Sequence, residues 1–325
     1  MKLVSYRQND HVGDPVGDPM GSGVGSGVGS WVGDGAARVG AVVDGWVLDL
    51  DDQATALAVP AEVVARLALH GLQPAPRGML RLLQAGPDAW HRLALAGAPR
   101  RPLAEVQLLA PVPRPGKVVA IGRNYADHAK ETGVAPFERP RVIAKLPSSV
   151  CAPGSRVRRP EGVAKLDFEV ELAVVIGAFA HRVAQAQALD FVAGYTVLDD
   201  LSAREFQFDI SPAQTTFAKS MDGFCPMGPW LVTRDEITDP QALELSCHVN
   251  GQPMQHGHTA DMLFPVARLI EYLSGFMTLE PGDVIATGTP AGIGAFRNPP
   301  VWLQPGDRIR MEISRIGVLE HEIAA

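Results

Sequence analysis

The segment Asp167–Gly177, DFEVELAVVIG, decides both the fold class and the place of the functional site. It is rich in β-branched residues and ends at a glycine, which predicts a β-strand. Because side chains alternate along a strand, we expect Asp167, Glu169 and Glu171 on one face. A row of like charges is unfavourable unless something neutralises it, and clustered carboxylates are typically neutralised by a hard divalent cation such as Mg²⁺ or Mn²⁺. A strand face exposed to solvent explains this segment equally well. The choice between this interpretation and a metal site therefore depends on the neighbouring segments.

A second predicted strand ends in acidic residues. The segment Gly194–Gln207 reads GYTVLDDLSAREFQ, so two acids and a polar turn follow an apolar run. Asp200 could complete a site of three carboxylates with Glu169 and Glu171. Such a site carries more negative charge than one divalent cation neutralises, so an anionic substrate would need cationic side chains nearby. The candidates are Arg123, Lys219 and Arg204.

A histidine and a glutamate lie three residues apart upstream, in the segment AIGRNYADHAKE that ends at residue 131. If this segment is helical, His128 and Glu131 share a face. A carboxylate beside an imidazole can orient it as a general base. An ordinary surface pair at this spacing is the alternative.

A Gly- and Pro-rich loop, TGTPAGIG over Thr287–Gly294, directly follows another predicted strand. Such a loop exposes backbone N–H groups, and Thr289 adds a hydroxyl, which together suit a substrate carboxylate. Loops of this composition also occur where the chain changes direction and binds no ligand. His256 and His258 are too isolated from other Cys or His ligands to indicate a zinc site.

The composition excludes several classes of protein. The chain has 325 residues, 46% of them hydrophobic and 20% charged, which is typical of globular domains. The formal net charge of −7 argues against a nucleic-acid partner, and no basic cluster indicates a membrane surface. The N-terminus is polar and no apolar run has the length of a membrane span. Three widely spaced cysteines indicate reduced thiols, so we predict a cytoplasmic protein.

The run PVPRPG over residues 111–116 predicts a boundary between a small domain, 1–110, and a larger domain, 111–325. Residues 12–35 are Gly-rich at a period of two, which cannot form a phosphate-binding GxGxxG motif, so we predict a flexible insertion. Strand-like segments dominate beyond residue 116.

Six ordered segments within residues 116–325 resemble the fumarylacetoacetate hydrolase superfamily. They are IGRNYADHAKE, LDFEVELAVVIG, GYTVLDDLSARE, AKSMDGFCPMGPW, VNGQPMQ, and TLEPGDVIATGTPAGIG continuing to LQPGDRIRMEI. The resemblance implies an α+β, mostly β fold. Its parts would be a mixed β-roll catalytic domain and a small N-terminal α+β domain before it. It also implies a homodimer that binds Mg²⁺ or Mn²⁺ and a small anionic 2-oxo acid.

The resemblance also assigns site residues by position. The metal ligands of the family fall on Glu169, Glu171 and Asp200. The family's substrate-facing groups fall on Arg204, Gln207 and Thr289, and its lysine on Lys219; Arg123 is a further candidate. The water-activating pair of acylpyruvase-like members falls on His128 and Glu131. Asp199 and Glu205 depart from the usual Asn and Asp, at positions that are not ligands.

Three functions compete. The first choice is metal-dependent hydrolysis of a C–C bond in a 2,4-dioxo acid, of the acylpyruvate or fumarylpyruvate type, in aromatic-compound catabolism. It rests on the retention of both His128 and Glu131. The alternative is a decarboxylase or isomerase acting on 2-hydroxyhepta-2,4-diene-1,7-dioate-like or oxaloacetate-like acids. The remote alternative is a non-catalytic metabolite-binding protein, which would need no water-activating pair.

Overall fold

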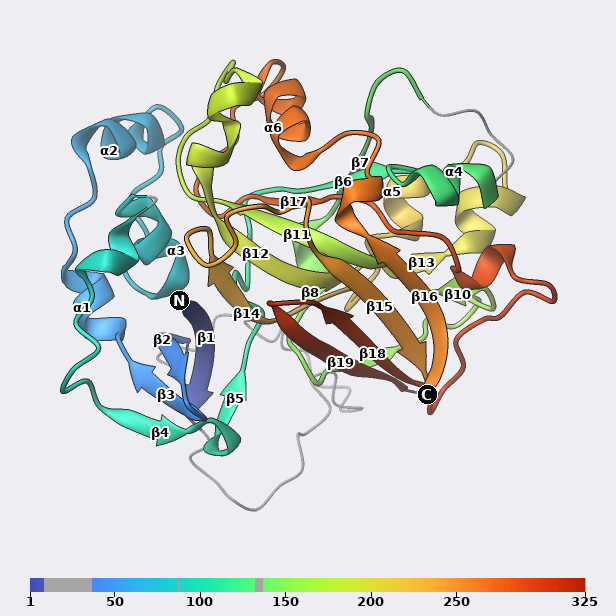
Figure 1. Ribbon diagram of the computed structural model, residues 1–325, viewed down its shortest axis with the longest axis horizontal. Coiled ribbons are helices and arrows are strands. Elements are labelled where there is room, and N and C mark those ends of the chain that lie inside the picture. The colour runs from blue at the N-terminus through green and yellow to red at the C-terminus, as the bar shows by residue number, and fades with distance from the viewer. Residues whose placement is uncertain (9–36, 87, 132–136, 325) are drawn as a thin grey trace.

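The computed structural model describes residues 1–8, 37–86, 88–131 and 137–324 (Figure 1). The predicted Gly-rich insertion at 12–35 lies outside the described residues. None of the helices in the described part of the chain combines the length and apolar character needed to cross a bilayer.

A large mixed sheet forms the centre of the molecule. Its strands follow the order β4-β3-β2-β1-β14-β12-β11-β17-β6-β7, with β5 beside β1 and β8 beside β14. The strands are β1 (Lys2–Gln8), β2 (Arg38–Val43), β3 (Trp46–Asp49), β4 (Arg100–Pro102), β5 (Val106–Leu108), β6 (Val118–Gly122), β7 (Arg141–Lys145), β8 (Val150–Cys151), β11 (Val170–Ile176), β12 (Val192–Asp199), β14 (Cys225–Thr233) and β17 (Val284–Ala286). Most neighbours are antiparallel, but β17 runs parallel to β6 and β8 runs parallel to β14.

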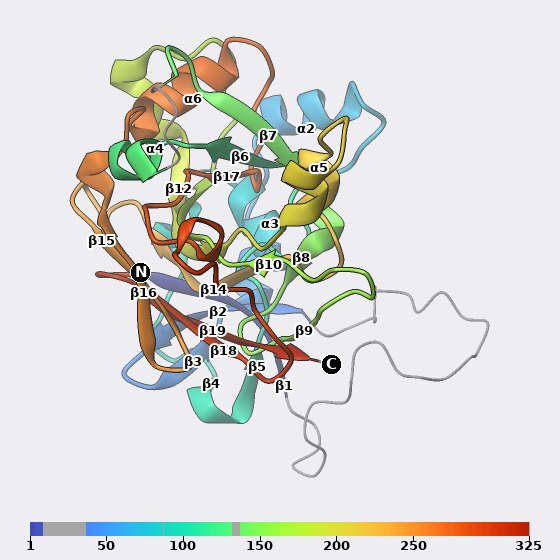
Figure 2. The same ribbon diagram turned by 90° about the vertical axis from the view of Figure 1, so that its right-hand side faces the viewer.

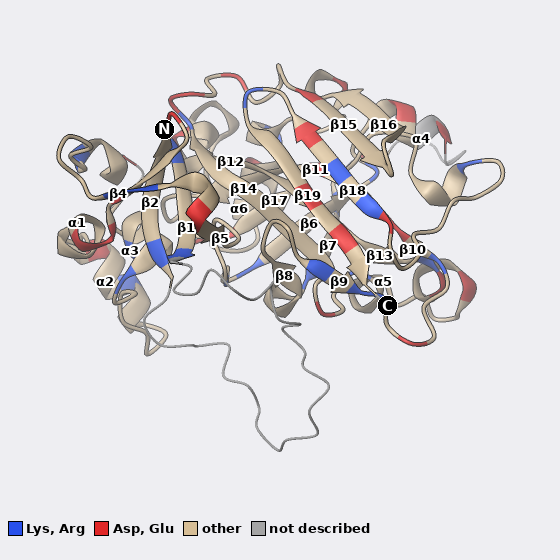
Figure 3. Cartoon of the chain, turned by 90° about the horizontal axis from the view of Figure 1, so that it is seen from below, with Lys and Arg blue, Asp and Glu red and all other residues tan. Residues whose placement is uncertain are grey.

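A five-stranded sheet, ordered β16-β15-β18-β19-β9, packs beside the large sheet (Figures 1 and 2). Its strands are β9 (Arg156–Arg158), β15 (Glu244–Val249), β16 (Gln252–His258), β18 (Arg308–Ile313) and β19 (Gly317–Ala324). Figure 3 colours the positions of charged residues along β18 and β19. In the register of these strands, Arg310 lies opposite Glu320. The alternate residues of both strands are buried.

Helices and short helical turns cover the sheets. The α-helices are α1 (Asp51–Ala56), α2 (Ala61–Ala68), α3 (Gly78–Gln84), α4 (Ala126–Glu131), α5 (Thr215–Ala218) and α6 (Val266–Ser274). A π-helical turn covers Glu205–Asp209, and 3₁₀ turns cover Ala89–Arg92, Leu103–Glu105, Pro147–Ser149, Gln185–Phe191, Thr259–Asp261 and Gly294–Phe296. Helix α6 begins after Pro265, so Asp261 does not cap it.

Strand β11 is buried along its whole length because the large sheet is covered on both faces. Leu172 and Val174 pack in the cluster shared with the five-stranded sheet and α6. Ala173 and Val175 pack in the cluster shared with α1 and α3. Carboxylates on this strand therefore lie in the protein interior, and the solvated strand face is excluded.

The predicted fold class is confirmed, because the chain is mostly β and combines a mixed roll with an N-terminal α+β part. Strands β1–β5 continue the large sheet through the pairing of β1 with β14. The boundary between residues 110 and 111 stays a prediction, and so does the homodimer.

Candidate active site

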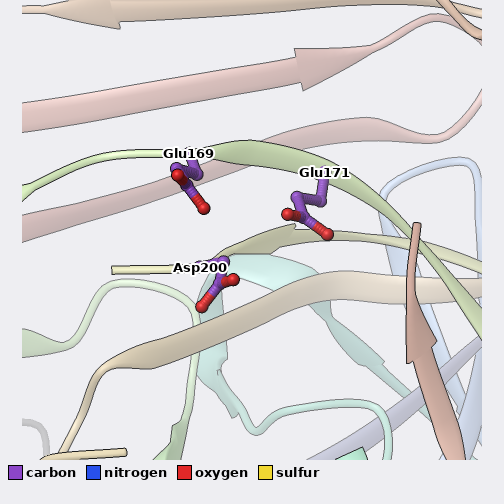
Figure 4. Close-up of side chains that lie close together, drawn as sticks. All are labelled: Glu169, Glu171 and Asp200. Carbon is purple, nitrogen blue, oxygen red and sulfur yellow. The ribbon is translucent and has the colours of Figure 1, made fainter. Parts of the chain in front are cut away.

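Three buried carboxylates meet where β11 begins and β12 ends (Figure 4). The antiparallel register places Val170 opposite Asp199, and Asp200 N donates a hydrogen bond of 3.0 Å to the Glu169 carbonyl. One carboxylate oxygen from each of Glu169, Glu171 and Asp200 lies within 4.8 Å of the others. The strand pairing alone thus creates the predicted cluster.

Asp167 does not join this cluster. The predicted strand is interrupted at Phe168 and Glu169, and Asp167 belongs to a short strand, β10 (Leu166–Asp167), which pairs with β13 (Ser202–Ala203). The Asp167 carboxylate instead accepts hydrogen bonds from Arg204 Nε (2.8 Å) and from the backbone N–H of Gly294 (2.7 Å). Asp167 is therefore linked to Glu169 through Arg204 and lies beside the three carboxylates rather than among them.

Glu171 lacks a cationic partner among the described residues. Its only hydrogen bond there comes from the Gly288 backbone N–H, at 2.8 Å. Burial, followed by the charges of Asp200 and Glu169, raises the pKa of Glu171 well above its ordinary value. A buried carboxylate with no counter-ion needs a cation. The all-oxygen donor set fits Mg²⁺ or Mn²⁺.

Lys219 and Arg204 hold the other carboxylates in place. Lys219 Nζ donates to Glu169 Oε2 (2.7 Å), Asp200 Oδ2 (2.6 Å) and Ser202 Oγ (2.8 Å), which uses all three ammonium hydrogens. Arg204 Nη2 donates to Glu169 Oε1 at 2.6 Å. Burial opposes ionisation of Glu169, but the charges of Arg204 and Lys219 outweigh it and hold its pKa below the ordinary value.

Lys145 is a member of this cluster that the sequence reasoning missed. It is fully buried at the end of β7, and its Nζ lies 2.7 Å from Asp200 Oδ1 and donates to the carbonyl of Phe224 at 2.9 Å. It also donates to the Lys219 carbonyl. The available signal was a lysine on the same strand face as the apolar Ile143, because such a lysine needs a buried partner.

The charges of this region nearly balance. The four carboxylates of Asp167, Glu169, Glu171 and Asp200 face three cationic groups, which leaves one negative charge. A divalent cation would make the region positive by one charge and ready for an anionic ligand.

His128 and Glu131 form the predicted pair on α4. His128 Nδ1 lies 2.9 Å from Glu131 Oε2, and both groups are mostly buried. Because the carboxylate only accepts hydrogen bonds, Nδ1 carries the hydrogen and Nε2 is left as the proton acceptor. Glu131 Oε1 also accepts a 3.0 Å hydrogen bond from Gly292 N, which fixes α4 against the Gly-rich loop.

The N–H groups of the Gly-rich loop are used by the protein itself. Gly288, Gly292 and Gly294 donate to Glu171, Glu131 and Asp167, respectively. A Cβ at Gly294 would lie 2.6 Å from Asp167 Oδ1, so glycine is needed for this approach. The expectation that these groups await a substrate carboxylate is therefore wrong.

Thr289 remains available to a ligand. Its Oγ1 accepts a 2.7 Å hydrogen bond from Gln255 Nε2, which leaves the hydroxyl hydrogen free to donate elsewhere. Gln207 is also partly available: its Oε1 accepts from Arg204 Nη1 at 2.7 Å, and its amide hydrogens have no acceptor among the described residues.

A buried Asp–His pair supports the carboxylates from behind. Asp199 Oδ1 accepts from Glu169 N at 2.9 Å, and Asp199 Oδ2 lies 2.8 Å from His321 Nε2 on β19. Burial raises the pKa of Asp199, and His321 opposes that rise. The departure from Asn at position 199 is thus matched by a histidine from the second sheet, which no local sequence signal reveals.

One pocket collects the predicted residues. It is lined by Arg123, His128, Glu169, Glu171, Asp200, Arg204, Gln207, Lys219 and Thr289, and Glu131 lies behind His128. Apolar side chains of Ile143, Ile293 and Phe296 complete the wall. Arg141 also lines it and was not predicted.

Comparisons with known proteins identify relatives of this chain. The family model for the fumarylacetoacetate (FAA) hydrolase C-terminal domain matches residues 117–324. The human mitochondrial oxaloacetate tautomerase FAHD2A is 43% identical over 251 residues, which cover 76% of this chain and 80% of that protein.

Two solved structures that are similar to this chain are named as an isomerase and as a hydrolase. The 2-hydroxyhepta-2,4-diene-1,7-dioate isomerase from Mycobacterium marinum is 29% identical, with a TM-score of 0.70, and the match covers 100% of this chain and 98% of that one. Maleylpyruvate hydrolase from Sphingobium sp. SYK-6, in complex with manganese(II) and pyruvate, is 30% identical, with a TM-score of 0.70 and coverage of 100% and 99%.

Proposed function

Because this chain belongs to the fumarylacetoacetate hydrolase family, we propose that it is a divalent-metal-dependent tautomerase or isomerase of 2-oxo acids of the oxaloacetate type. The His128–Glu131 pair in the same pocket as the three carboxylates carries the general-base, metal-dependent part of the proposal, and the relatives carry the choice of reaction. A relative named oxaloacetate tautomerase and a structural neighbour named as a dienedioate isomerase support it. This differs from the hydrolase that the sequence analysis placed first.

Glu169, Glu171 and Asp200 would hold the cation. When bound there, Mg²⁺ or Mn²⁺ supplies a Lewis acid for the 2-oxo and carboxylate oxygens and so favours the enolate form. Lys219, Arg204 and Lys145 keep the carboxylates in position before any ligand arrives, so no reorganisation is needed during the reaction.

The residues of the chain move one proton. His128 Nε2 takes a proton from C3 of the keto acid, while Nδ1–H stays hydrogen-bonded to Glu131. Returning that proton to the oxygen on C2 gives the enol. With a 2-hydroxydienoate, the base instead takes the proton of the C2 hydroxyl and returns it to a carbon of the chain, which gives the 2-oxo isomer. Substrate and product are isomers, so no water is consumed. The Thr289 hydroxyl is placed to donate to an anionic oxygen of the ligand.

Hydrolysis is the second candidate. The same His128 could deprotonate water for attack on a distal carbonyl. The structural neighbour named maleylpyruvate hydrolase, in complex with pyruvate, favours this possibility. The His128–Glu131 pair does not separate the two reactions, since each needs one general base. The case for hydrolysis therefore rests on neighbours with that name rather than on the pair.

Product analysis separates the two reactions. The metal-loaded protein would be incubated separately with oxaloacetate, a 2-hydroxyhepta-2,4-dienedioate and acylpyruvates, and the products identified by NMR. We expect isomers of the first two compounds and little pyruvate from acylpyruvates. Rapid release of pyruvate from an acylpyruvate, without isomerisation of either dioate, would replace this proposal with the hydrolase.

A further inference from the structure

Two arginines in the pocket have no carboxylate partner among the described residues. Arg123 and Arg141 both line the pocket and are half-buried. The other pocket cations, Lys219 and Arg204, are each bound to two carboxylates. Segment 132–136, TGVAP, lies close in sequence and contains no acidic residue.

Local backbone structure brings the two arginines together. Gly122 pairs with Arg141 between β6 and β7, and Arg123 follows directly. A Cβ at Gly122 would lie 3.3 Å from Arg141 Cδ, so the absence of a side chain there makes room for the arginine stem. Arg123 adopts the left-handed region at φ 55°, which is unfavourable for a non-glycine residue and is common at ligand sites.

The two guanidinium groups repel each other in the absence of an anion. Burial, together with the charge of Arg141, lowers the pKa of Arg123 below its ordinary value. The guanidinium carbon of Arg123 also lies 5.7 Å from the centre of the Phe137 ring. Two unneutralised arginines facing one pocket form a favourable setting for a carboxylate or phosphate.

Strand β7 connects this pair to the carboxylate cluster. Arg141, Ile143 and Lys145 alternate onto the same face, and Lys145 contacts Asp200 at the far end. Four residues of strand separate the first and last Cα atoms by about 13 Å. Ile143 lies between Arg141 and Lys145 on this face, and Ile293 and Phe296 also line the pocket. The pocket therefore has one end formed by the three carboxylates, an apolar middle and a second end formed by the two arginines.

We propose that Arg123 and Arg141 bind a second carboxylate of the substrate, so that the enzyme selects 2-oxo dicarboxylates over 2-oxo monocarboxylates. This rests on the proposed function and adds to it the class of acid that the site accepts. The 2-oxo carboxylate occupies the end formed by Glu169, Glu171 and Asp200, and the hydrocarbon part of the ligand lies along the apolar wall.

Matched pairs of ligands test the proposal by binding alone. Isothermal titration calorimetry with Mg²⁺-loaded protein would compare 2-oxovalerate with 2-oxoglutarate, 2-oxohexanoate with 2-oxoadipate, and 2-oxoheptanoate with 2-oxopimelate. Members of a pair differ only in the terminal carboxylate. We expect at least one dicarboxylate to bind roughly 10- to 100-fold more tightly than its partner, as charge-assisted hydrogen bonds allow.

Substitutions locate the effect. In Arg141→Gln and Arg123→Gln, the ratio of the two dissociation constants should fall close to one. Arg139→Gln is the matched control, because Arg139 is exposed, outside the pocket and only two residues from Arg141; it should retain the ratio. Equal weakening of both ligand classes by Arg141→Gln, or no preference at any chain length in the wild type, would overturn the subsite.

The outcomes separate the two proposals. A dicarboxylate preference that depends on Arg141, found in a protein that isomerises nothing, would support the subsite and refute the proposed function. Isomerisation of 2-oxo acids without any such preference would refute the subsite alone.

Discussion

The two ends of the pocket differ in how their charges are satisfied. At the carboxylate end, Lys219 and Arg204 are buried and saturated by Glu169, Asp200 and Asp167. At the other end, Arg123 and Arg141 are half-buried and have no acidic partner among the residues described. The first end is fixed before a ligand arrives, whereas the second end gains its neutralising charge only from a ligand. Substitutions at the first end should therefore affect stability or chemistry, and those at the second end should affect ligand choice.

The largest loss of activity is expected from Glu171→Gln. This carboxylate has no cation of its own in the described structure, so its neutralisation removes charge that a metal would need. Metal affinity, measured by calorimetry, should fall by at least about 10- to 100-fold, and turnover should approach background. The melting temperature of the metal-free protein should not fall, because no cation in the described structure loses a partner and glutamine can still accept the hydrogen bond from Gly288 N. A marked drop would mean that Glu171 supports the fold.

The next largest effect is expected at the general base. His128→Ala should lower isomerisation by about 10²–10⁴-fold. Glu131→Gln should give a smaller loss, since glutamine can still accept the Nδ1–H hydrogen bond. The double variant should be little worse than His128→Ala, because the pair acts as a unit. If steady-state assays show that the loss of activity in the double variant equals the product of the two single losses, the two residues act separately.

Lys219→Met tests the carboxylate end of the pocket by its effect on the free energy of unfolding. It removes one partner from Glu169 and one from Asp200 while both carboxylates remain buried. Breaking a buried ion pair in this way costs about 3–5 kcal/mol, which urea unfolding of the metal-free protein would measure. An unchanged free energy of unfolding would contradict the idea that this lysine fixes the carboxylates.

A moderate effect is expected from His321→Ala. The change leaves Asp199 buried without its partner, and Asp199 positions the Glu169 backbone. Metal affinity should fall by about 10- to 100-fold, as for other groups that support metal ligands. Asp199→Asn should be milder, because an amide can still accept from Glu169 N. Equal metal affinity in wild type and His321→Ala would rule out this support.

The smallest effect on stability is expected at the arginine end. Arg141→Gln removes a charge that repels Arg123 and has no acidic partner in the described structure. The melting temperature should therefore stay the same or rise slightly. A clear fall, with Arg139→Gln as the reference, would show that Arg141 is part of the fold and would weaken the contrast between the two ends.

Much of this site could be predicted because its residues lie in short local patterns. The spacing of Glu169 and Glu171 on a strand, and of His128 and Glu131 on a helix, already brings each pair together. Residues that depend on distant contacts were missed. Lys145 meets Asp200 only through the fold, and His321 meets Asp199 from another sheet.

Other features depend on breaks in regular structure or on distant partners. No sequence signal shows that the predicted strand is interrupted before Val170. The N–H groups of the loop at 288–294 were expected to be free, since no sequence pattern shows that Glu131 and Asp167 accept from them. The sequence around Arg141 does not indicate that it lines the pocket, because its position there depends on its pairing opposite Gly122.

The most direct test of the central claim is the rate at which enol oxaloacetate converts to its keto form, followed by ultraviolet absorbance. The measurement would compare protein loaded with Mg²⁺ or Mn²⁺, protein treated with a chelator, and no protein. We predict acceleration above the uncatalysed rate only with the metal-loaded protein, and no release of pyruvate above background. Lack of acceleration by the loaded protein, together with cleavage of an acylpyruvate to pyruvate, would contradict the account.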